Sequence, residues 1–175
     1  MFRRNPPTLL VVDDFYNDPD DVRDIALSAD YGSDLRYFKG ERSTSQYLFP
    51  YVKEEFERLL GVEITRWMDY DANGVFQITT PEDPLVYHYD LQRWAGAVYL
   101  NPDGGGGTSF WRHKLSGLVR GPALLPTEHF TDRDAWDHVE TVVGRYNRLV
   151  IWDASLFHSA EVYADERLVH LYFFD

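Results

Sequence analysis

The most informative part of this chain is Leu85–Trp111, LVYHYDLQRWAGAVYLNPDGGGGTSFW. It places His88 and Asp90 two residues apart in a segment typical of a β-strand, and residues two apart on a strand point to the same face. A second strand is expected over Ala95–Leu100, and a glycine-rich turn leads into a third over Thr108–Trp111. The stretch therefore predicts an imidazole and a carboxylate held side by side on a β-sheet.

Such a pair supplies two ligands of a facial metal site, in which two His and one carboxylate leave the other positions of Fe(II) open. The third ligand is expected at His158, after the strand-like run Leu149–Asp153. Arg167 follows nine residues later, at the start of a last predicted strand. A competing pair of the same spacing, His138 and Glu140, lies in a polar, acid-rich connection. His138 and Glu140 are not followed by the strand, glycine-rich turn and second strand that follow His88 and Asp90. The sequence therefore favours His88 and Asp90 as the ligand pair.

The complete pattern resembles the Fe(II)/2-oxoglutarate-dependent dioxygenases, specifically their prolyl 4-hydroxylase-like branch. The similarity covers residues 75–174, and Leu9–Phe15 adds a weaker likeness at the start of the chain. Gly32–Pro50 and Pro122–Glu140 match nothing in that family. The residues that carry the resemblance are His88-Tyr89-Asp90, Tyr99-Leu100-Asn101, Gly106-Gly107-Thr108-Ser109-Phe110, His158 and Arg167.

This resemblance implies that His88, Asp90 and His158 bind Fe(II), that 2-oxoglutarate chelates the metal, and that O2 is the co-substrate. The implied reaction releases succinate and CO2 and hydroxylates an amino acid, a peptide or a protein side chain. In halogenating relatives a small residue replaces the carboxylate ligand. Because Asp90 is present here, hydroxylation is favoured over halogenation.

The resemblance also implies that Arg167 binds the 5-carboxylate of 2-oxoglutarate, with the Tyr99 hydroxyl on the same group. Along its predicted strand Arg167 alternates with apolar residues, so its side chain is expected to face inward. A buried guanidinium requires a partner and suits a carboxylate. The alternative partner is a structural acid, with Asp153 as a candidate. Gln77, on the strand before the His-x-Asp pair, is a further candidate for the cofactor pocket.

Length, cysteine content and net charge limit the kinds of protein and site that this sequence can form. A single domain is expected over residues 1–175, and the absence of cysteine excludes disulfides and thiolate metal ligands. The net charge of −12 argues against a nucleic-acid partner. It favours either a neutral or cationic substrate or a surface whose acidity serves only to keep the protein in solution. No long apolar stretch or signal-peptide pattern is present, so no membrane partner and a cytoplasmic location are expected.

The pattern of elements predicts a mainly β protein: a double-stranded β-helix, or cupin-like jelly roll, with N-terminal helices packed on one sheet. Helices are expected after Asp18-Pro19 and over Val52–Leu60, which ends at Gly61. Strands are expected over residues 8–15, 64–68, 75–80, 85–90, 95–100, 108–111, 149–153 and 167–174.

Several alternatives remain open at this level. Gly104–Gly107 is interpreted as a hairpin turn rather than a phosphate site, because neither a helix nor a lysine follows it. Pro122–Glu140 is either a lid over the substrate or a solvated loop. A non-catalytic jelly-roll binding module that keeps the metal pocket is the second hypothesis for function. A cupin-like metalloenzyme without 2-oxoglutarate is the third, although it leaves Arg167 unexplained. The sequence does not indicate the oligomeric state.

Overall fold

The computed structural model describes residues 6–33, 40–162 and 165–175. These ranges contain two antiparallel sheets, a seven-stranded sheet of order β1-β8-β5-β10-β4-β3-β2 and a three-stranded sheet of order β7-β6-β9. The strands are β1 Leu9–Val12, β2 Tyr31–Gly32, β3 Glu41–Ser43, β4 Phe76–Thr79, β5 Trp94–Tyr99, β6 Gly106–His113, β7 Trp136–Val143, β8 Leu149–Asp153, β9 His158–Val162 and β10 Arg167–Phe174. The helices are α1 Pro19–Ser28 and α2 Val52–Leu60, with short 3-10 turns η1 Thr127–Phe130 and η2 Arg133–Ala135.

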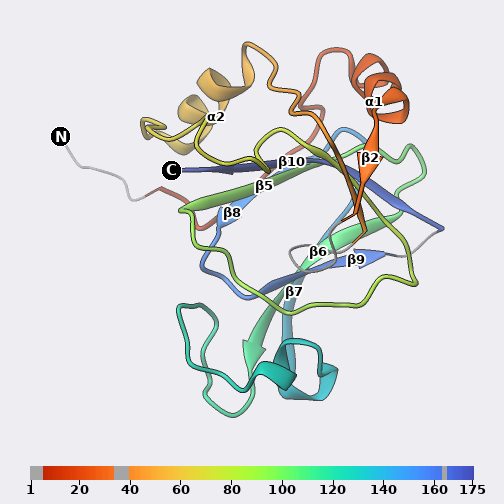
Figure 1. Ribbon diagram of the computed structural model, residues 1–175. Helices are drawn as coiled ribbons and strands as arrows, with labels where there is room; N and C mark the ends of the chain where they lie inside the picture. The colour runs from red at the N-terminus through yellow and green to blue at the C-terminus, as the bar shows by residue number, and fades with distance from the viewer. Residues whose placement is uncertain (1–5, 34–39, 163–164) are drawn as a thin grey trace.

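The molecule has three layers. Figure 1 shows α1 and α2 on one face of the large sheet and β6, β7 and β9 on the other. One apolar cluster fills the space between the helices and the large sheet, and a second lies between the two sheets. This arrangement confirms the predicted jelly roll with N-terminal helices on one sheet.

Strand β10 lies next to β5 at the centre of the large sheet, and its successive side chains point alternately into the two apolar clusters. Its residues Leu168, Tyr172 and Phe174 belong to the cluster under the helices. Val169 and Leu171 belong to the cluster between the sheets. Because strand side chains alternate between faces, Arg167 shares the inner face with these last two residues, as the sequence predicts.

The start of α1 and the end of α2 are set by residues that are visible in the sequence, Pro19 and Gly61. Helix α2 has the predicted bounds, buries Val52, Phe56 and Leu60 on one side, and ends at Gly61, whose φ of 67° is left-handed. Helix α1 begins with Pro19 at its first position, where the missing N–H costs no hydrogen bond. Its buried face completes the outer layer. None of the described helices is both long and apolar enough to cross a membrane.

Two predicted strands are wrong. Residues 64–68 form no strand, because their hydrogen bonds to other backbone groups of the described residues are confined to Asp175: Thr65 and Arg66 donate to its carbonyl, and its N–H donates to the Arg66 carbonyl. Residues 85–90 reduce to a single bridge at His88. The reason is that Tyr87, His88 and Asp90 donate their N–H groups to three separate segments, at Phe130, His158 and Ala154, so no continuous ladder forms.

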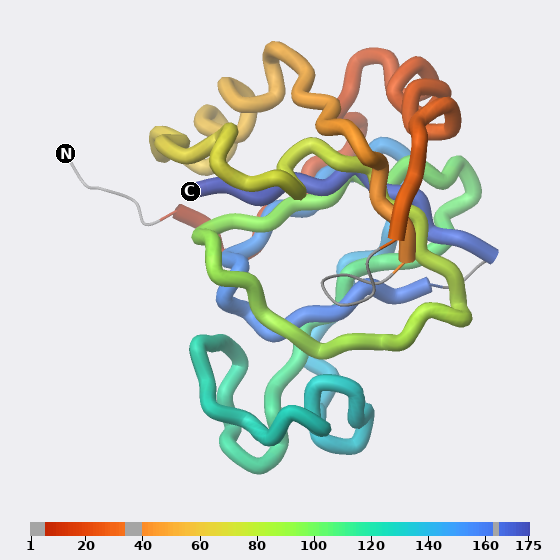
Figure 2. Tube along the Cα trace, in the orientation of Figure 1, coloured from red at the N-terminus to blue at the C-terminus, as the bar shows by residue number. Residues whose placement is uncertain are grey.

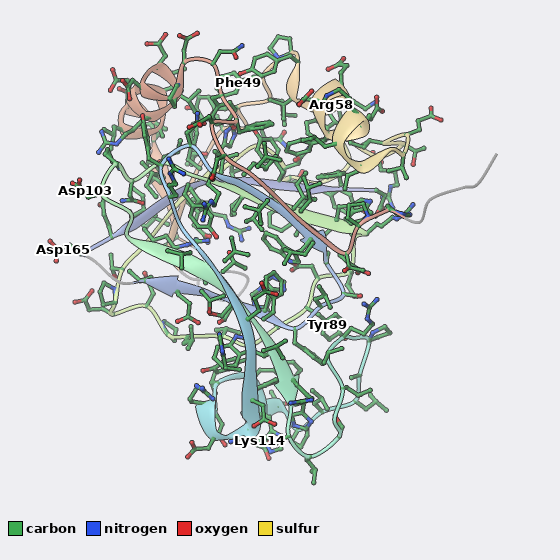
Figure 3. The ribbon with its side chains drawn as sticks, turned by 180° about the vertical axis from the view of Figure 1, so that it is seen from behind. Phe49, Arg58, Tyr89, Asp103, Lys114 and Asp165 are labelled. Atoms are coloured by element: carbon green, nitrogen blue, oxygen red, sulfur yellow. The ribbon has the colours of Figure 1, made fainter. Side chains whose placement is uncertain are left out.

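Four of the described strands were not predicted, namely β2, β3, β7 and β9. The segment Pro122–Glu140, interpreted as a lid or a loop, instead contains η1, η2 and the first half of β7. Strand β9 begins at His158 itself. Strands β6 and β7 extend past the large sheet into a projecting lobe, where Tyr87, Trp111, Trp136 and Phe157 form a third apolar cluster. Lys114 marks the far end of this lobe and Tyr89 its junction with the body (Figure 3).

The glycine-rich segment connects the two sheets. Strands β5 and β6 belong to different sheets, so Gly104–Gly107 is not a hairpin turn between paired strands. Gly104 and Gly105 have φ values of 87° and 132°, which let the chain turn sharply from one sheet to the other. Gly106 and Gly107 already belong to β6. The absence of a following helix does agree with the exclusion of a phosphate site.

Candidate metal centre and cavity

The candidate metal ligands are held by backbone hydrogen bonds. The extended segment 81–92 crosses beside β9 (Figure 2), and His88 and His158 exchange N–H···O=C bonds of 3.0 and 2.7 Å. The Asp90 N–H donates to the carbonyl of Ala154 at 2.8 Å, next to the end of β8. One possible ligand atom from each of His88, Asp90 and His158 lies within 4.8 Å of the other two. Among the described residues this is the group of His, Cys, Asp and Glu that could hold a metal ion.

The hydrogen bond made by Nδ1 determines the tautomer of the His88 ring and of the His158 ring. His88 Nδ1 lies 3.1 Å from the Val86 carbonyl, and His158 Nδ1 lies 2.8 Å from that of Leu156. A carbonyl oxygen only accepts, so both Nδ1 atoms carry the proton. In the neutral rings each Nε2 therefore presents a lone pair, at 4.0 and 3.4 Å from the Asp90 carboxylate oxygens. Three electron-rich groups thus converge with no proton between them, which a divalent cation relieves.

The carboxylate stays charged in this setting. Burial raises the pKa of Asp90. When the rings take up a second proton in the absence of a cation, the hydrogen bond and charge of His158, together with the charges of His88 and Arg42, outweigh burial and hold the pKa of Asp90 below its usual value. The His88 side chain is 41% exposed and that of His158 only 6%. The centre is therefore open to the cavity on the His88 side.

A cavity of about 690 Å³ surrounds these ligands between the two sheets. This size is within the range of small-molecule sites. The small Ala95 and Ala97 on the same face of β5 leave room for it. Apart from the three candidate ligands it is lined by Arg42, Asp69, Tyr70, Asp71, Ala72, Gln77, Pro84, Val86, Gln92, Thr108, Trp152, Ala160, Arg167, Leu171 and Phe173.

Arg167 is the least satisfied polar side chain in this cavity. It is 3% exposed, and its Nε and Nη1 atoms lack hydrogen-bond partners among the described residues. Its guanidinium carbon lies 5.3 Å from the centre of the Tyr99 ring. The structural alternative fails for Asp153, because that carboxylate pairs with Arg120 at 3.0 Å. Burial lowers the pKa of Arg167, so an anion in the cavity would stabilise its charged form.

Gly106 makes room for this arginine. A Cβ at Gly106 would lie 2.8 Å from Cδ of Arg167 and 2.1 Å from the Glu161 carbonyl oxygen. Both distances are far below van der Waals contact, so the glycine is required for the arginine stem to pack against β6. The sequence shows the glycine but not this reason for it.

Tyr99 and Gln77 have different positions. The buried Tyr99 hydroxyl lies 2.8 Å from the Thr108 hydroxyl, and Thr108, not Tyr99, is among the described residues that line the cavity. Gln77 lines the cavity from β4, where it is the register partner of Val169. The structure thus brings His88, Asp90, His158, Arg167 and Gln77 to one cavity and places Tyr99 directly behind it.

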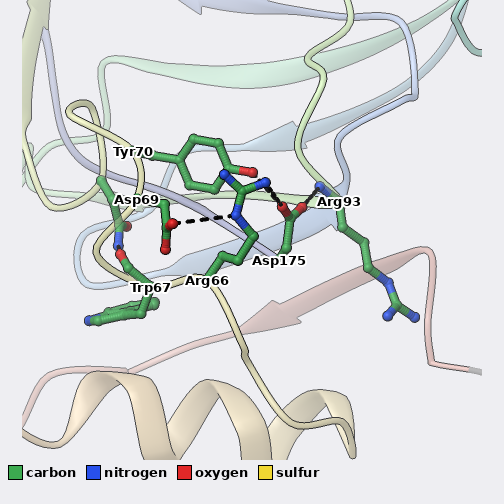
Figure 4. Close-up of polar contacts among 7 residues, drawn as sticks. Arg66, Trp67, Asp69, Tyr70, Arg93 and Asp175 are labelled. Atoms are coloured by element: carbon green, nitrogen blue, oxygen red, sulfur yellow. Dashed lines mark hydrogen bonds and ion pairs between the residues drawn. The ribbon is translucent and has the colours of Figure 1, made fainter.

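The rim of the cavity is fastened to the chain end. Asp175 accepts hydrogen bonds from the Arg66 guanidinium, the Tyr70 hydroxyl and the Arg93 backbone (Figure 4). Arg66 also lies 3.5 Å from Asp69. These contacts fix the 66–72 segment, from which Asp69, Tyr70, Asp71 and Ala72 reach the cavity. The 122–140 segment contributes none of the described lining residues, so the predicted lid role receives no support from this placement.

Most of the other lining residues were not predicted from the sequence, and Thr108, Trp152 and Arg42 show why. Thr108 lies in the quoted glycine-rich stretch and is part of the resemblance, but the sequence gives it no role in the cavity. The Trp152 ring lies 5.0 Å from that of His158, and was interpreted as part of an apolar run. Arg42 lies in Gly32–Pro50, where the sequence has no clear period. Its inward position on a three-residue strand carries no local signal.

No protein-family model matches the sequence, and no curated protein matches it. Solved structures do. HygX of Streptomyces hygroscopicus, with nickel, 2-oxoglutarate and hygromycin B bound, aligns with a TM-score of 0.59 at 12% identity over 95% of this chain and 82% of its own. A Pseudomonas putida prolyl-4-hydroxylase gives 0.53 at 14% identity, over 95% and 91%. The α-ketoglutarate-dependent epimerase SnoN gives 0.55 at 16%, over 95% and 75%. This chain has the fold that these three structures share.

Proposed function

We propose that this protein is an Fe(II)- and 2-oxoglutarate-dependent oxygenase that hydroxylates an amino acid, a peptide or a protein side chain. The observation that carries the proposal is the convergence of the His88 and His158 Nε2 lone pairs on the Asp90 carboxylate, with both Nδ1 protons committed to backbone carbonyls. Two imidazoles and a carboxylate match the facial ligand set of non-heme Fe(II). HygX, which shares the fold, binds nickel and 2-oxoglutarate.

The cavity also fits the cofactor. Arg167 offers buried, unpartnered Nε and Nη1 donors to a carboxylate, and the Thr108 hydroxyl lines the same cavity. Tyr99 orients that hydroxyl through its 2.8 Å hydrogen bond. We assign Arg167 and Thr108 to the 5-carboxylate of 2-oxoglutarate, with Tyr99 acting through Thr108 and Gln77 beside them. Two parallel guanidinium hydrogen bonds would give both affinity and orientation.

When bound, the iron and 2-oxoglutarate supply the oxidising chemistry. The chain's own residues do the rest: the three ligands fix the metal, Arg167 fixes the cofactor, and the cavity walls hold the substrate near the metal while limiting access of water. A cupin-like enzyme that does not use 2-oxoglutarate would leave the buried donors of Arg167 without a function.

The direct test is turnover. The Fe(II)-loaded protein is incubated aerobically with 2-oxoglutarate, and succinate is quantified with and without candidate amino acids and peptides. We expect slow succinate formation without substrate and faster formation with a suitable one. The matched control is Asp90→Asn, which keeps the side-chain size but removes the ligand charge. Equal succinate formation by the parent and Asp90→Asn would contradict the proposal.

A further inference from the structure

A second arginine faces the cavity, in addition to Arg167. Strand register places Arg42 of β3 opposite Gln77 of β4, and Gln77 opposite Val169 of β10. Register partners lie on the same face of a sheet. Arg42 is therefore on the inner face, where it lines the cavity with the candidate metal ligands.

The two arginines occupy different parts of that face. Arg167 is the register partner of Thr79, two residues along β4 from the partner of Arg42. They are also separated laterally, since β4 lies between β3 and β10. Adjacent strands are about 4.8 Å apart. The backbone positions of the two arginines are therefore two strand spacings and two residues apart on the inner face.

The surroundings of the Arg42 guanidinium suit a ligand of mixed character. Its carbon lies 5.7 Å from the centre of the Phe173 ring, and its charge interacts with that of Asp90. Burial lowers the pKa of Arg42 to about 10. Phe173 is the apolar group beside Arg42, and Leu171 and Trp152 add apolar wall elsewhere in the same cavity. A cation held against aromatic and aliphatic walls favours an anionic group attached to an apolar body.

2-Oxoglutarate does not require this arginine. On the proposed function its 1-carboxylate and keto oxygen are at the metal and its 5-carboxylate is at Arg167, so both of its charges already have partners. We propose that Arg42 binds a carboxylate of the primary substrate, and that the substrate class is a small carboxylic acid with an apolar body. This inference rests on the proposed function. It departs from the neutral or cationic substrate expected from the net charge, because surface charge steers encounters whereas Arg42 acts at contact distance.

The test measures discrimination between acids and amides. The protein is loaded with Ni(II), which supports binding without turnover, and saturated with 2-oxoglutarate. Calorimetry then gives the Kd of L-leucine, L-phenylalanine, 4-methylpentanoate and phenylacetate, each beside its primary amide. We expect at least one acid to bind about tenfold or more tightly than its amide, as for a charge-assisted contact. Arg42→Gln should remove that preference and Arg42→Lys should keep part of it.

The control variant is Arg112→Gln, which removes an arginine on β6 paired with Asp137 at 3.8 Å, outside the described cavity lining. It should keep the acid preference. The inference is overturned if no acid is preferred by the parent, or if Arg42→Gln binds 2-oxoglutarate normally and still prefers the acid. If Arg42→Gln does not fold, Arg42→Lys and the parent preference decide. Failure of the parent to bind Ni(II) and 2-oxoglutarate would instead count against the proposed function.

Discussion

His88 and His158 exchange two backbone hydrogen bonds, and their rings lie 4.3 Å apart. This single bridge connects the 81–92 segment to β9, so two candidate ligands distant in sequence are aligned by each other's backbone. The side chains need only small adjustments to share an ion. Because the ion would bind both segments, it should stabilise the folded state by an amount that grows with the logarithm of the free ion concentration above its Kd.

Replacing either histidine should abolish tight metal binding. In His88→Ala or His158→Ala two ligands remain, and we expect Fe(II) affinity to fall by more than about 100-fold, beyond the usual effect of changing a residue behind a ligand. Metal analysis after reconstitution measures this. His138→Ala is the matched control, since His138 is exposed and bonded to Thr141. Stoichiometric iron in both ligand variants would show that the ligands are wrongly assigned.

Arg167→Ala should weaken 2-oxoglutarate binding by about 2–5 kcal/mol while leaving Fe(II) binding nearly intact, because it removes one partner of a buried charge pair. Arg167→Lys should recover only part of the affinity, since a point charge cannot form two parallel hydrogen bonds. Arg120→Ala, which removes the surface partner of Asp153, is the control. An Arg167→Ala protein that melts early yet binds 2-oxoglutarate like the parent would identify a structural role instead.

Gly106→Ala should displace the Arg167 side chain while leaving its guanidinium group unchanged. The added Cβ would meet the Glu161 carbonyl oxygen at 2.1 Å and Arg167 Cδ at 2.8 Å. We expect a loss of about 1–3 kcal/mol in unfolding free energy, typical of overpacking, together with weaker 2-oxoglutarate binding. Gly32→Ala is the control, because its Cβ would meet Thr44 at an ordinary 3.7 Å. Parent-like melting and affinity in Gly106→Ala would refute the packing role.

The buried His170 predicts an acid-dependent loss of stability. Burial lowers its pKa from 6.5 to about 3, and its Nδ1 accepts from the Tyr16 hydroxyl at 2.8 Å. Between these values the unfolded chain binds a proton that the folded chain does not. The contribution is therefore complete above about pH 6.5 and declines as the pH falls toward 3, by up to about 1.4 kcal/mol per pH unit.

Chemical unfolding of the parent and of His170→Asn between pH 6.5 and 4.5 tests this. The slope of unfolding free energy against pH should be smaller in the variant by about one proton. His138→Asn, at an exposed position, should keep the parent slope. Identical slopes for the parent and His170→Asn would mean that His170 is not held neutral.

The sequence predicts those features that depend on neighbouring residues. Helix α2 and the inward face of β10 follow from local periodicity and from Gly61. The candidate ligand set, which the structure brings together, follows from the order of His88, Asp90 and His158. Residues 85–90 were mistaken for a strand, because alternation shows that a segment is extended but not that one neighbour accepts all its hydrogen bonds.

Features that depend on distant contacts were not predictable. Arg42 enters the cavity only because β3 pairs with β4, and nothing in residues 41–43 shows this pairing. Strand β7 lies in a polar segment whose buried residue, Trp136, packs against Tyr87 and Phe157 of other elements. The place of Tyr99 behind Thr108 likewise depends on β5 and β6 lying in opposite sheets.

The most direct test of the central claim is an anaerobic titration of the Fe(II)-loaded protein with 2-oxoglutarate, followed by visible absorption. If His88, Asp90 and His158 hold the iron with open positions and Arg167 receives the 5-carboxylate, the charge-transfer band of the iron chelate should grow to saturation at one 2-oxoglutarate per iron. The absence of the band in protein that has bound stoichiometric iron would contradict the account.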